Sequence, residues 1–149
     1  MSAFDYAVKL LGYRARTEKE LRERLRDKSY EPEAVEKALQ RLAAVGLIDD
    51  DKFAESFVHS RLSIMRRGKY RICLEMKRRG FSRELTEKWT SQISADDEIE
   101  VARELLESRI RSWSNLDELT RKRRALGLLG RRGFAPNIIY RLLKEIQTS

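Results

Sequence analysis

Apolar residues recur along most of the chain at intervals of three and four, the spacing that places them on one face of an α-helix. Within residues 3–12, for example, this spacing puts Phe4, Ala7, Val8 and Leu11 on a common face. Similar apolar stripes continue to the end of the chain, and strands are expected to be scarce. The pattern therefore predicts an all-α protein.

Residues that favour helix starts stand where these stripes begin. Thr17 and Glu20 have the spacing of a capping box, in which each side chain accepts a hydrogen bond from the backbone N–H of the other. Pro32 suits the first position of a helix, where a backbone N–H would lack a partner anyway. The acids at 49–51 and 96–97 precede long stripes, and negative charge there opposes the positive end of the helix dipole.

A short motif occurs three times and indicates an internal repeat. Leu25 to Tyr30, Met76 to Phe81 and Leu129 to Phe134 each run from an apolar residue through three mostly basic or small positions to a small residue and an aromatic one. Pro32 and Pro136 follow two residues after the aromatic residue, at matching helix starts. The period of about 50 residues predicts nine helices in three units of three, residues 1–48, 49–95 and 96–149, each packing on its neighbour.

The positive net charge of the chain favours a negatively charged partner. The chain has 32 Lys and Arg against 24 Asp and Glu, a formal net charge of +8, and 38% of its residues are charged. Clustered basic residues gain affinity for nucleic acids by releasing counterions from phosphates. The alternative is a soluble helical surface with many ion pairs, which fits segments where Glu alternates with Lys or Arg at helical spacing.

The basic residues are densest between residues 66 and 82, where seven of them face the single acid Glu75. Because local acids leave this stretch and a second one near residues 121–132 almost unpaired, both are predicted to contact DNA or an acidic partner. The Tyr70 side chain has two possible roles at this point: it stacks on a base or a partner side chain, or it packs in the core. The predicted contact residues are Arg66, Arg67, Lys69, Tyr70, Arg71, Lys77, Arg78, Arg79, Arg121, Lys122, Arg123, Arg124, Arg131 and Arg132.

Residues for catalysis or cofactor binding are hard to find. His59 is the one histidine and Cys73 the one cysteine, so no nucleophile and base pair, disulfide or thiolate metal site is expected. The glycines do not form a phosphate-binding loop, and the acidic clusters fit helix capping better than metal binding. No apolar run approaches the roughly 20 residues that span a bilayer. We therefore expect a cytoplasmic protein without catalytic residues, cofactor or metal.

The order and spacing of several motifs resemble the RecX family of bacterial regulatory proteins, over nearly the whole chain. The closing motif at residues 132–134 is similar to the last repeat of that family. The other segments that carry the resemblance are Tyr6-Ala-Val-Lys-Leu-Leu, Thr17-Glu-Lys-Glu-Leu-Arg, Gly46-Leu-Ile-Asp-Asp50, Phe53-Ala54, Arg61, Gly68, Ile72 and Arg79-Gly80-Phe81-Ser82.

The resemblance implies an elongated, curved array of tandem three-helix repeats. It also implies a regulator, mainly an inhibitor, of the recombinase RecA in homologous recombination, DNA repair and the SOS response. Such a protein binds along the groove of the RecA–DNA filament and limits ATP hydrolysis and strand exchange. The expected partners are the RecA filament, single-stranded DNA and, as a further ligand, double-stranded DNA, with no membrane partner and a monomeric state.

Two points stay open at the level of sequence. Many members of the family have a second glycine two residues before the one that matches Gly68, whereas this chain has Arg66 there. The alternative function is a general nucleic-acid-binding helical protein that acts without RecA. Sequence also leaves open whether the basic residues contact DNA or an acidic surface of RecA.

Overall fold

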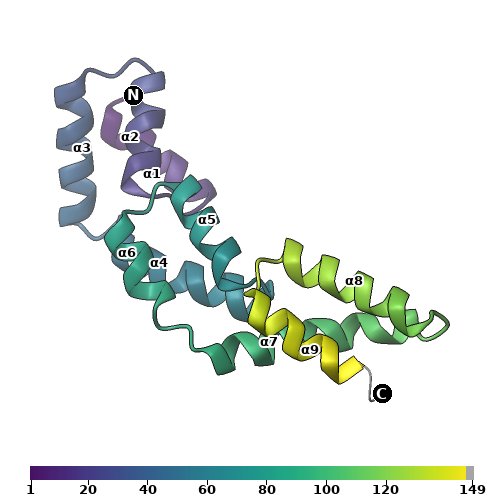
Figure 1. Cartoon of the computed structure of the whole chain (residues 1–149). Coiled ribbons are helices and arrows are strands. Elements are labelled where there is room, and N and C mark those ends of the chain that lie inside the picture. Colours follow the sequence, from purple (N-terminus) through teal and green to yellow (C-terminus); the bar gives the residue numbers. More distant parts are fainter. Residues whose placement is uncertain (147–149) are drawn as a thin grey trace. The chain divides into compact units, whose positions relative to one another are not determined.

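The computed structural model describes residues 1–146 and is built from helices (Figure 1). Over these residues it has nine α-helices and no strand, which confirms the predicted all-α class. The last residues of the third predicted repeat, 147–149, lie outside the described part of the chain. The helices are α1 (Ala3–Tyr13), α2 (Glu18–Asp27), α3 (Pro32–Ala44), α4 (Asp50–His59), α5 (Lys69–Arg79), α6 (Arg83–Thr90), α7 (Ala95–Ile110), α8 (Glu118–Arg131) and α9 (Pro136–Ile146), with a π-helical turn at Ser60–Ile64 and a 3-10 turn at Arg111–Trp113.

The chain forms two compact units, which are described separately. Of the described residues, unit 1 comprises 1–56 and 76–86, and unit 2 comprises 57–75 and 87–146. In unit 1, α1, α2 and α3 pack against one another in pairs, and in unit 2, α7, α8 and α9 do the same (Figure 1). The predicted repeat boundaries at residues 48 and 95 stay a prediction.

The helix starts follow the local signals in the sequence. The Thr17 hydroxyl accepts from the Glu20 N–H at 3.1 Å and the Glu20 carboxylate accepts from the Thr17 N–H at 3.0 Å, which confirms the predicted capping box. Pro32 is the first residue of α3, as expected. Ser94 and Asp97 form a second capping box at α7, in the acidic segment that was predicted to begin a helix.

Each unit has its own apolar core. Leu21, Leu25 and Leu42 are fully buried in unit 1, and Leu129 and Ala102 in unit 2. The predicted inner face of α1 is partly wrong. Val8 is 39% exposed, whereas Leu10 is only 4% exposed, because the helix turns Ala3, Ala7 and Leu10 toward α2 and α3.

The three repeated motifs form the same turn at the end of a helix. Ser29, Gly80 and Gly133 adopt left-handed φ values of 70°, 91° and 81°. In each turn the N–H of the following aromatic residue donates to the carbonyl of the apolar residue five positions earlier, which satisfies a carbonyl that the helix end leaves free. The three hydrogen bonds are Tyr30 to Leu25 at 3.2 Å, Phe81 to Met76 at 3.1 Å and Phe134 to Leu129 at 3.1 Å. We call each turn a joint.

In unit 2, the joint after α8 lies directly against the start of α5. The Gly68 N–H donates to the Arg132 carbonyl at 2.7 Å, and the Tyr70 N–H donates to the Gly133 carbonyl at 3.1 Å. A Cβ atom on Gly68 would overlap the Gly133 carbonyl, and one on Gly133 would overlap the backbone of Arg71. Two helix ends with opposite partial charges therefore meet backbone to backbone.

Unit 1 contains a related contact between the joint after α5 and the start of α2. The Thr17 hydroxyl donates to the Arg79 carbonyl at 2.7 Å, while the Arg79 guanidinium donates to the Glu20 carboxylate and the Ala15 carbonyl, both at 3.0 Å. A Cβ atom on Gly80 would stand 3.0 Å from the Cβ of Lys19. The same kind of joint thus docks on a helix start in both units.

A carboxylate completes each of these helix starts. Asp50 accepts from the Glu18 N–H at 3.1 Å in unit 1, and Glu98 accepts from the Lys69 N–H at 3.2 Å in unit 2. Burial raises the pKa of both carboxyls above their usual range, although the backbone N–H that each accepts acts in the opposite direction. Both acids therefore cap a helix at the cost of being partly removed from water.

Replacing Gly133 by alanine is expected to destabilise unit 2 by at least about 2 kcal/mol. The left-handed backbone at this position is strained for a residue with a Cβ, and the new Cβ would also overlap Arg71. Gly130→Ala is the matched control. Nothing lies within 4 Å of its added Cβ, and alanine favours the helix by up to about 1 kcal/mol. Urea unfolding followed by circular dichroism measures both variants. Equal stability of the two variants would contradict the close contact between Gly133 and Arg71.

Glu98→Gln keeps an oxygen that can accept from Lys69 but removes the buried charge. Because the folded-state pKa of Glu98 is raised, the wild-type protein loses stability as the pH rises from about 4, the usual glutamate range, through the folded-state value. The unfolding free energy of the variant, relative to wild type, should therefore increase between about pH 4 and pH 7. Glu100→Gln, at an exposed position of the same helix, should show no such trend.

Candidate functional site

Five arginines from three segments gather in unit 2, and we call them the arginine cluster. Arg67 precedes α5, Arg71 lies in its first turn, Arg109 lies at the end of α7, and Arg131 and Arg132 follow one another at the end of α8. The docking of the α8 joint on the start of α5 brings residues about 60 positions apart together, since Arg71 donates to the Arg131 carbonyl at 3.5 Å. The Arg132 guanidinium likewise donates to the Met65 carbonyl at 2.7 Å.

The cluster is held together against charge repulsion. Burial, and then the nearness of Arg109, Arg67, Arg71 and Arg131, lowers the pKa of Arg132. One carboxylate, Glu75, offsets part of this charge: it pairs with Arg67, and with Arg71 at 3.1 Å and Arg61 at 3.4 Å, and its side chain is only 13% exposed. A bound anion would relieve the remaining repulsion.

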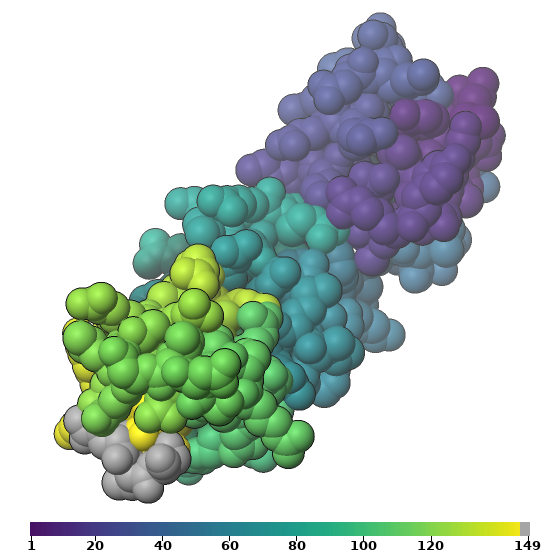
Figure 2. Space-filling view, turned by 90° about the vertical axis from the view of Figure 1, so that its right-hand side faces the viewer, coloured from purple at the N-terminus to yellow at the C-terminus, as the bar shows by residue number. Residues whose placement is uncertain are grey.

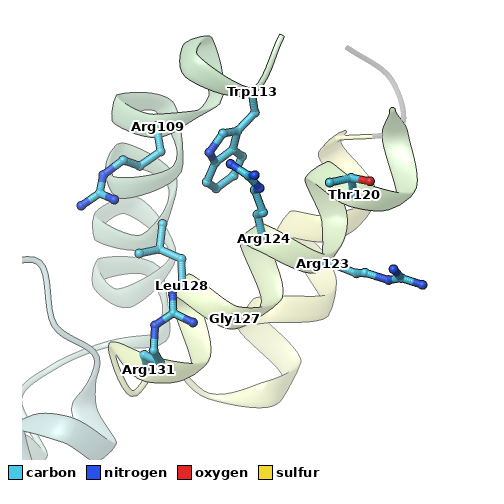
Figure 3. Close-up of a pocket in the computed structure, with 8 residues that line it drawn as sticks. All are labelled: Arg109, Trp113, Thr120, Arg123, Arg124, Gly127, Leu128 and Arg131. Atoms are coloured by element: carbon cyan, nitrogen blue, oxygen red, sulfur yellow. The ribbon is translucent and has the colours of Figure 1, made fainter. Parts of the chain in front are cut away.

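A hollow of about 460 Å³ lies beside α7 and α8, and we call it the α7–α8 hollow. Arg109, Arg123, Arg124 and Arg131 line it together with Thr120, Gly127, Leu128 and Trp113. In Figure 3, Arg124 lies beside the Trp113 indole and Arg131 near Leu128, whereas Arg123 points away from both. The residues of α8 are at the surface of unit 2 that faces the viewer in Figure 2.

A second hollow of about 500 Å³, the α5–α8 hollow, is lined by four members of the arginine cluster and Met65. Arg131 lines both hollows. Gly127 leaves room for this side chain, since a Cβ atom at that position would stand 2.9 Å from the Arg131 Nη1. The two hollows therefore adjoin at one exposed arginine.

The structure corrects the expectation that the basic residues between 66 and 82 are almost unpaired. Arg67 and Arg71 share Glu75, Arg66 lies 3.7 Å from Glu104, and Arg79 pairs with Glu20. Except for Glu75, these acids lie far away in the sequence and reach the arginines only through folding. Lys122 pairs with Glu118 at 3.3 Å, within one helix. Charge reversal at Arg67, Arg71 or Arg79 would therefore disturb the fold as well as any ligand.

Several of the other predicted contact residues are exposed or lack a described ion pair. Over the described residues, Lys77 and Arg78 make no ion pair and are exposed in the last turn of α5, within unit 1. Lys69 begins α5, and Arg121 is half-buried with an Nε that has no described partner. Tyr70 is 66% exposed, so its alternative of core packing is wrong. Its stacking on a ligand stays a prediction.

Arg109 was missed by sequence reasoning. It stands in an acid-rich helix, where Glu104 and Glu107 suggest a salt-bridged surface rather than a basic one. Only the packing of α7 with α8 and the docking of α5 bring it near Arg132. No periodic or local signal in the sequence marks it.

Two further features concern metals and membranes. Within residues 1–146, no group of three or more His, Cys, Asp or Glu side chains is arranged to hold a metal ion. His59 is exposed at the end of α4. None of the described helices combines the length and apolar composition needed to cross a bilayer.

Comparisons with known proteins match most of the chain. The sequence models of the first, second and third three-helix domains of RecX match residues 3–42, 49–88 and 96–143. The regulatory protein RecX of Amycolatopsis mediterranei (strain U-32) is 37% identical over 96% of this chain and 82% of its own length. The chain belongs to the RecX family. The regulatory protein RecX of Mycobacterium sp. (strain JLS) is 36% identical over 91% of this chain and 76% of that protein.

Two solved structures share the fold. The crystal structure of RecX from Lactobacillus salivarius aligns with a TM-score of 0.83 at 22% identity, over 99% of this chain and 96% of that one. A second crystal structure, of a regulatory protein RecX, gives 0.80 at 24% identity, over 96% of this chain and 71% of that one. At these identities the likeness concerns the fold alone.

Arg66, the residue by which this chain departs from the family pattern, has a left-handed φ of 53°. Arg66→Gly should therefore stabilise the protein by about 0.5 to 1 kcal/mol, because glycine adopts this φ without the side-chain clash. Arg66→Ala, the control, keeps that clash and removes only a partly exposed ion pair, so its stability should stay within about 0.5 kcal/mol of wild type. Thermal unfolding compares them. A glycine variant no more stable than the alanine variant would contradict the strain.

Proposed function

We propose that this protein is a regulator, mainly an inhibitor, of the recombinase RecA. It binds the RecA–DNA filament through its exposed basic residues and so limits ATP hydrolysis and strand exchange. The observation that carries the proposal is the arginine cluster with its two adjoining hollows, on a chain that belongs to the RecX family.

The charge arrangement supports a polyanionic partner. Five arginines lie together with one shared carboxylate, although like charges at short range repel. Such an arrangement is favourable when a ligand brings negative charge, and DNA phosphates also release condensed counterions on binding. The exposed Lys77 and Arg78 of unit 1 add basic residues that no described acid neutralises.

In this proposal the protein is a ligand of an enzyme and not itself a catalyst. The side chains in the two hollows are arginines, a threonine and apolar residues, which suit the binding of anions. A guanidinium group is in general a poor general base. Regulation would follow from occupancy of the filament.

The arginine cluster also suits a second function, general binding of nucleic acid without RecA. This alternative predicts tight, salt-dependent binding to free DNA and no effect on RecA beyond competition for DNA. The two functions separate when DNA is in large excess over both proteins. Inhibition that persists in excess DNA supports the regulator, and inhibition that disappears supports the general binder.

Wild-type protein should lower the rate of RecA-dependent ATP hydrolysis on single-stranded DNA as its concentration is raised. Replacing Lys77, Arg78, Arg124 and Arg131 by glutamine should raise the concentration for half-inhibition about tenfold or more, which corresponds to about 1.4 kcal/mol of binding. These residues are exposed and make no described ion pair, so the fold should be kept.

The matched control replaces Lys9, Arg24, Arg111 and Arg141 by glutamine, because these four basic residues are also exposed. It removes the same charge and should inhibit nearly as well as wild type. If wild-type protein leaves ATP hydrolysis unchanged, the proposed regulation is wrong. If both variants weaken equally, net charge rather than these residues determines inhibition.

A further inference from the structure

We propose that the arginine cluster binds successive phosphates of a DNA backbone, with Arg131 contacting the strand between the two hollows, rather than an acidic surface of a protein. The inference rests on the proposed function, since it assigns DNA within the filament as the partner of this site. It also assigns a binding role to Arg109, which follows only from the structure.

The first argument is the pairing of the hollows. The α7–α8 hollow and the α5–α8 hollow have similar volumes, about 460 and 500 Å³, and both include Arg131 in their lining. A nucleic-acid strand presents the same charged group at every nucleotide, so two arginine-lined hollows that share Arg131 suit a ligand with repeated negative charges. Arginine suits this ligand because its planar fork of N–H donors matches phosphate oxygens.

The second argument is the scarcity of exposed apolar surface in the hollows. Trp113 and Leu128 are 7% and 6% exposed, so Met65 is the one apolar side chain in either lining that is freely accessible. The core of a protein–protein interface is usually apolar and rich in aromatic residues. Interfaces with DNA are more polar and much more positively charged. The linings therefore match a nucleic-acid backbone better than a protein.

The third argument is the distribution of acids around α7. No acidic side chain lines either of the two basic hollows. Asp96, Glu100, Glu104 and Glu107 instead line a separate hollow with Ile99, Arg103 and Arg141. The same helix thus carries an acidic surface along its length and Arg109 at its end. The acidic surface repels phosphates, which favours a strand on the side of the arginine cluster.

Gly127 offers a test that leaves every charge in place. A Cβ atom there would stand 2.9 Å from the Arg131 Nη1, the far end of a flexible side chain. Gly127→Ala should therefore move Arg131 away from its place between the hollows while favouring the helix by up to about 1 kcal/mol. Weaker DNA binding by a variant that is no less stable would assign the loss to the position of Arg131.

The experiment measures binding of the full chain to a labelled oligothymidylate by fluorescence anisotropy over a range of salt concentrations, without RecA. Arg109→Gln combined with Arg131→Gln should reduce the slope of log affinity against log salt by about 1.4, since each phosphate contact contributes about 0.7 on a single strand. Arg24→Gln combined with Arg141→Gln removes the same charge from exposed residues outside the cluster and should leave the slope unchanged.

Further ligands identify the chemistry. An abasic oligonucleotide of the same length should bind wild-type protein with the same slope, because phosphates and not bases are contacted. If the Arg109/Arg131 variant keeps the DNA slope but loses binding to a polyglutamate peptide, the cluster binds acidic protein and the proposal is wrong.

The same variants separate this inference from the proposed function. Loss of salt slope without any inhibition of RecA by wild-type protein would support the phosphate site and overturn the regulator. Inhibition by wild-type protein together with an unchanged DNA slope in the variant would support the regulator and overturn the phosphate site.

Discussion

In unit 2, the backbone at Gly68 and the backbone at Gly133 pass in direct contact, and the rest of the unit depends on this contact. No side chain fits between them, so the carbonyls that end α8 reach the N–H groups that begin α5. The negative end of one helix dipole thereby satisfies the positive end of another, without a cap from either helix's own side chains. The arginine cluster depends on this contact, because the contact brings Arg71 to Arg131 and Arg132 to Met65.

In unit 1, the contact between a joint and a helix start is made by different atoms. There the Thr17 hydroxyl bonds the Arg79 carbonyl, and the Arg79 guanidinium reaches Glu20 and Ala15, so one side chain and one ion pair replace part of the backbone contact. A carboxylate from a following helix, Asp50 or Glu98, completes the helix start in each case. Arginine therefore has a structural use in unit 1, whereas in unit 2 several arginines remain accessible to a ligand.

Much of the fold was predictable because its signals are local. The capping box at Thr17, the proline at the start of α3 and the repeated joints each depend on residues within six positions of one another. The pairing of the arginines was not predictable, since Glu20 and Glu104 meet Arg79 and Arg66 only after folding. Arg109 escaped notice for the same reason. The misplaced face of α1 shows the limit of spacing alone, because Phe4 and Val8 share a stripe although only one of them packs inward.

The type of residue with the left-handed φ at each joint indicates whether another helix contacts that joint. All three joints adopt the left-handed conformation, yet Ser29 is exposed and carries a side chain, whereas Gly80 and Gly133 are approached by a neighbouring helix start. Glycine is thus required by contact with that neighbour, and the bend itself tolerates serine. In a chain of such repeats, a glycine in this place would mark a joint on which another repeat rests, and a larger residue would mark a joint open to solvent. The number of docked interfaces could then be counted directly from the amino-acid sequence.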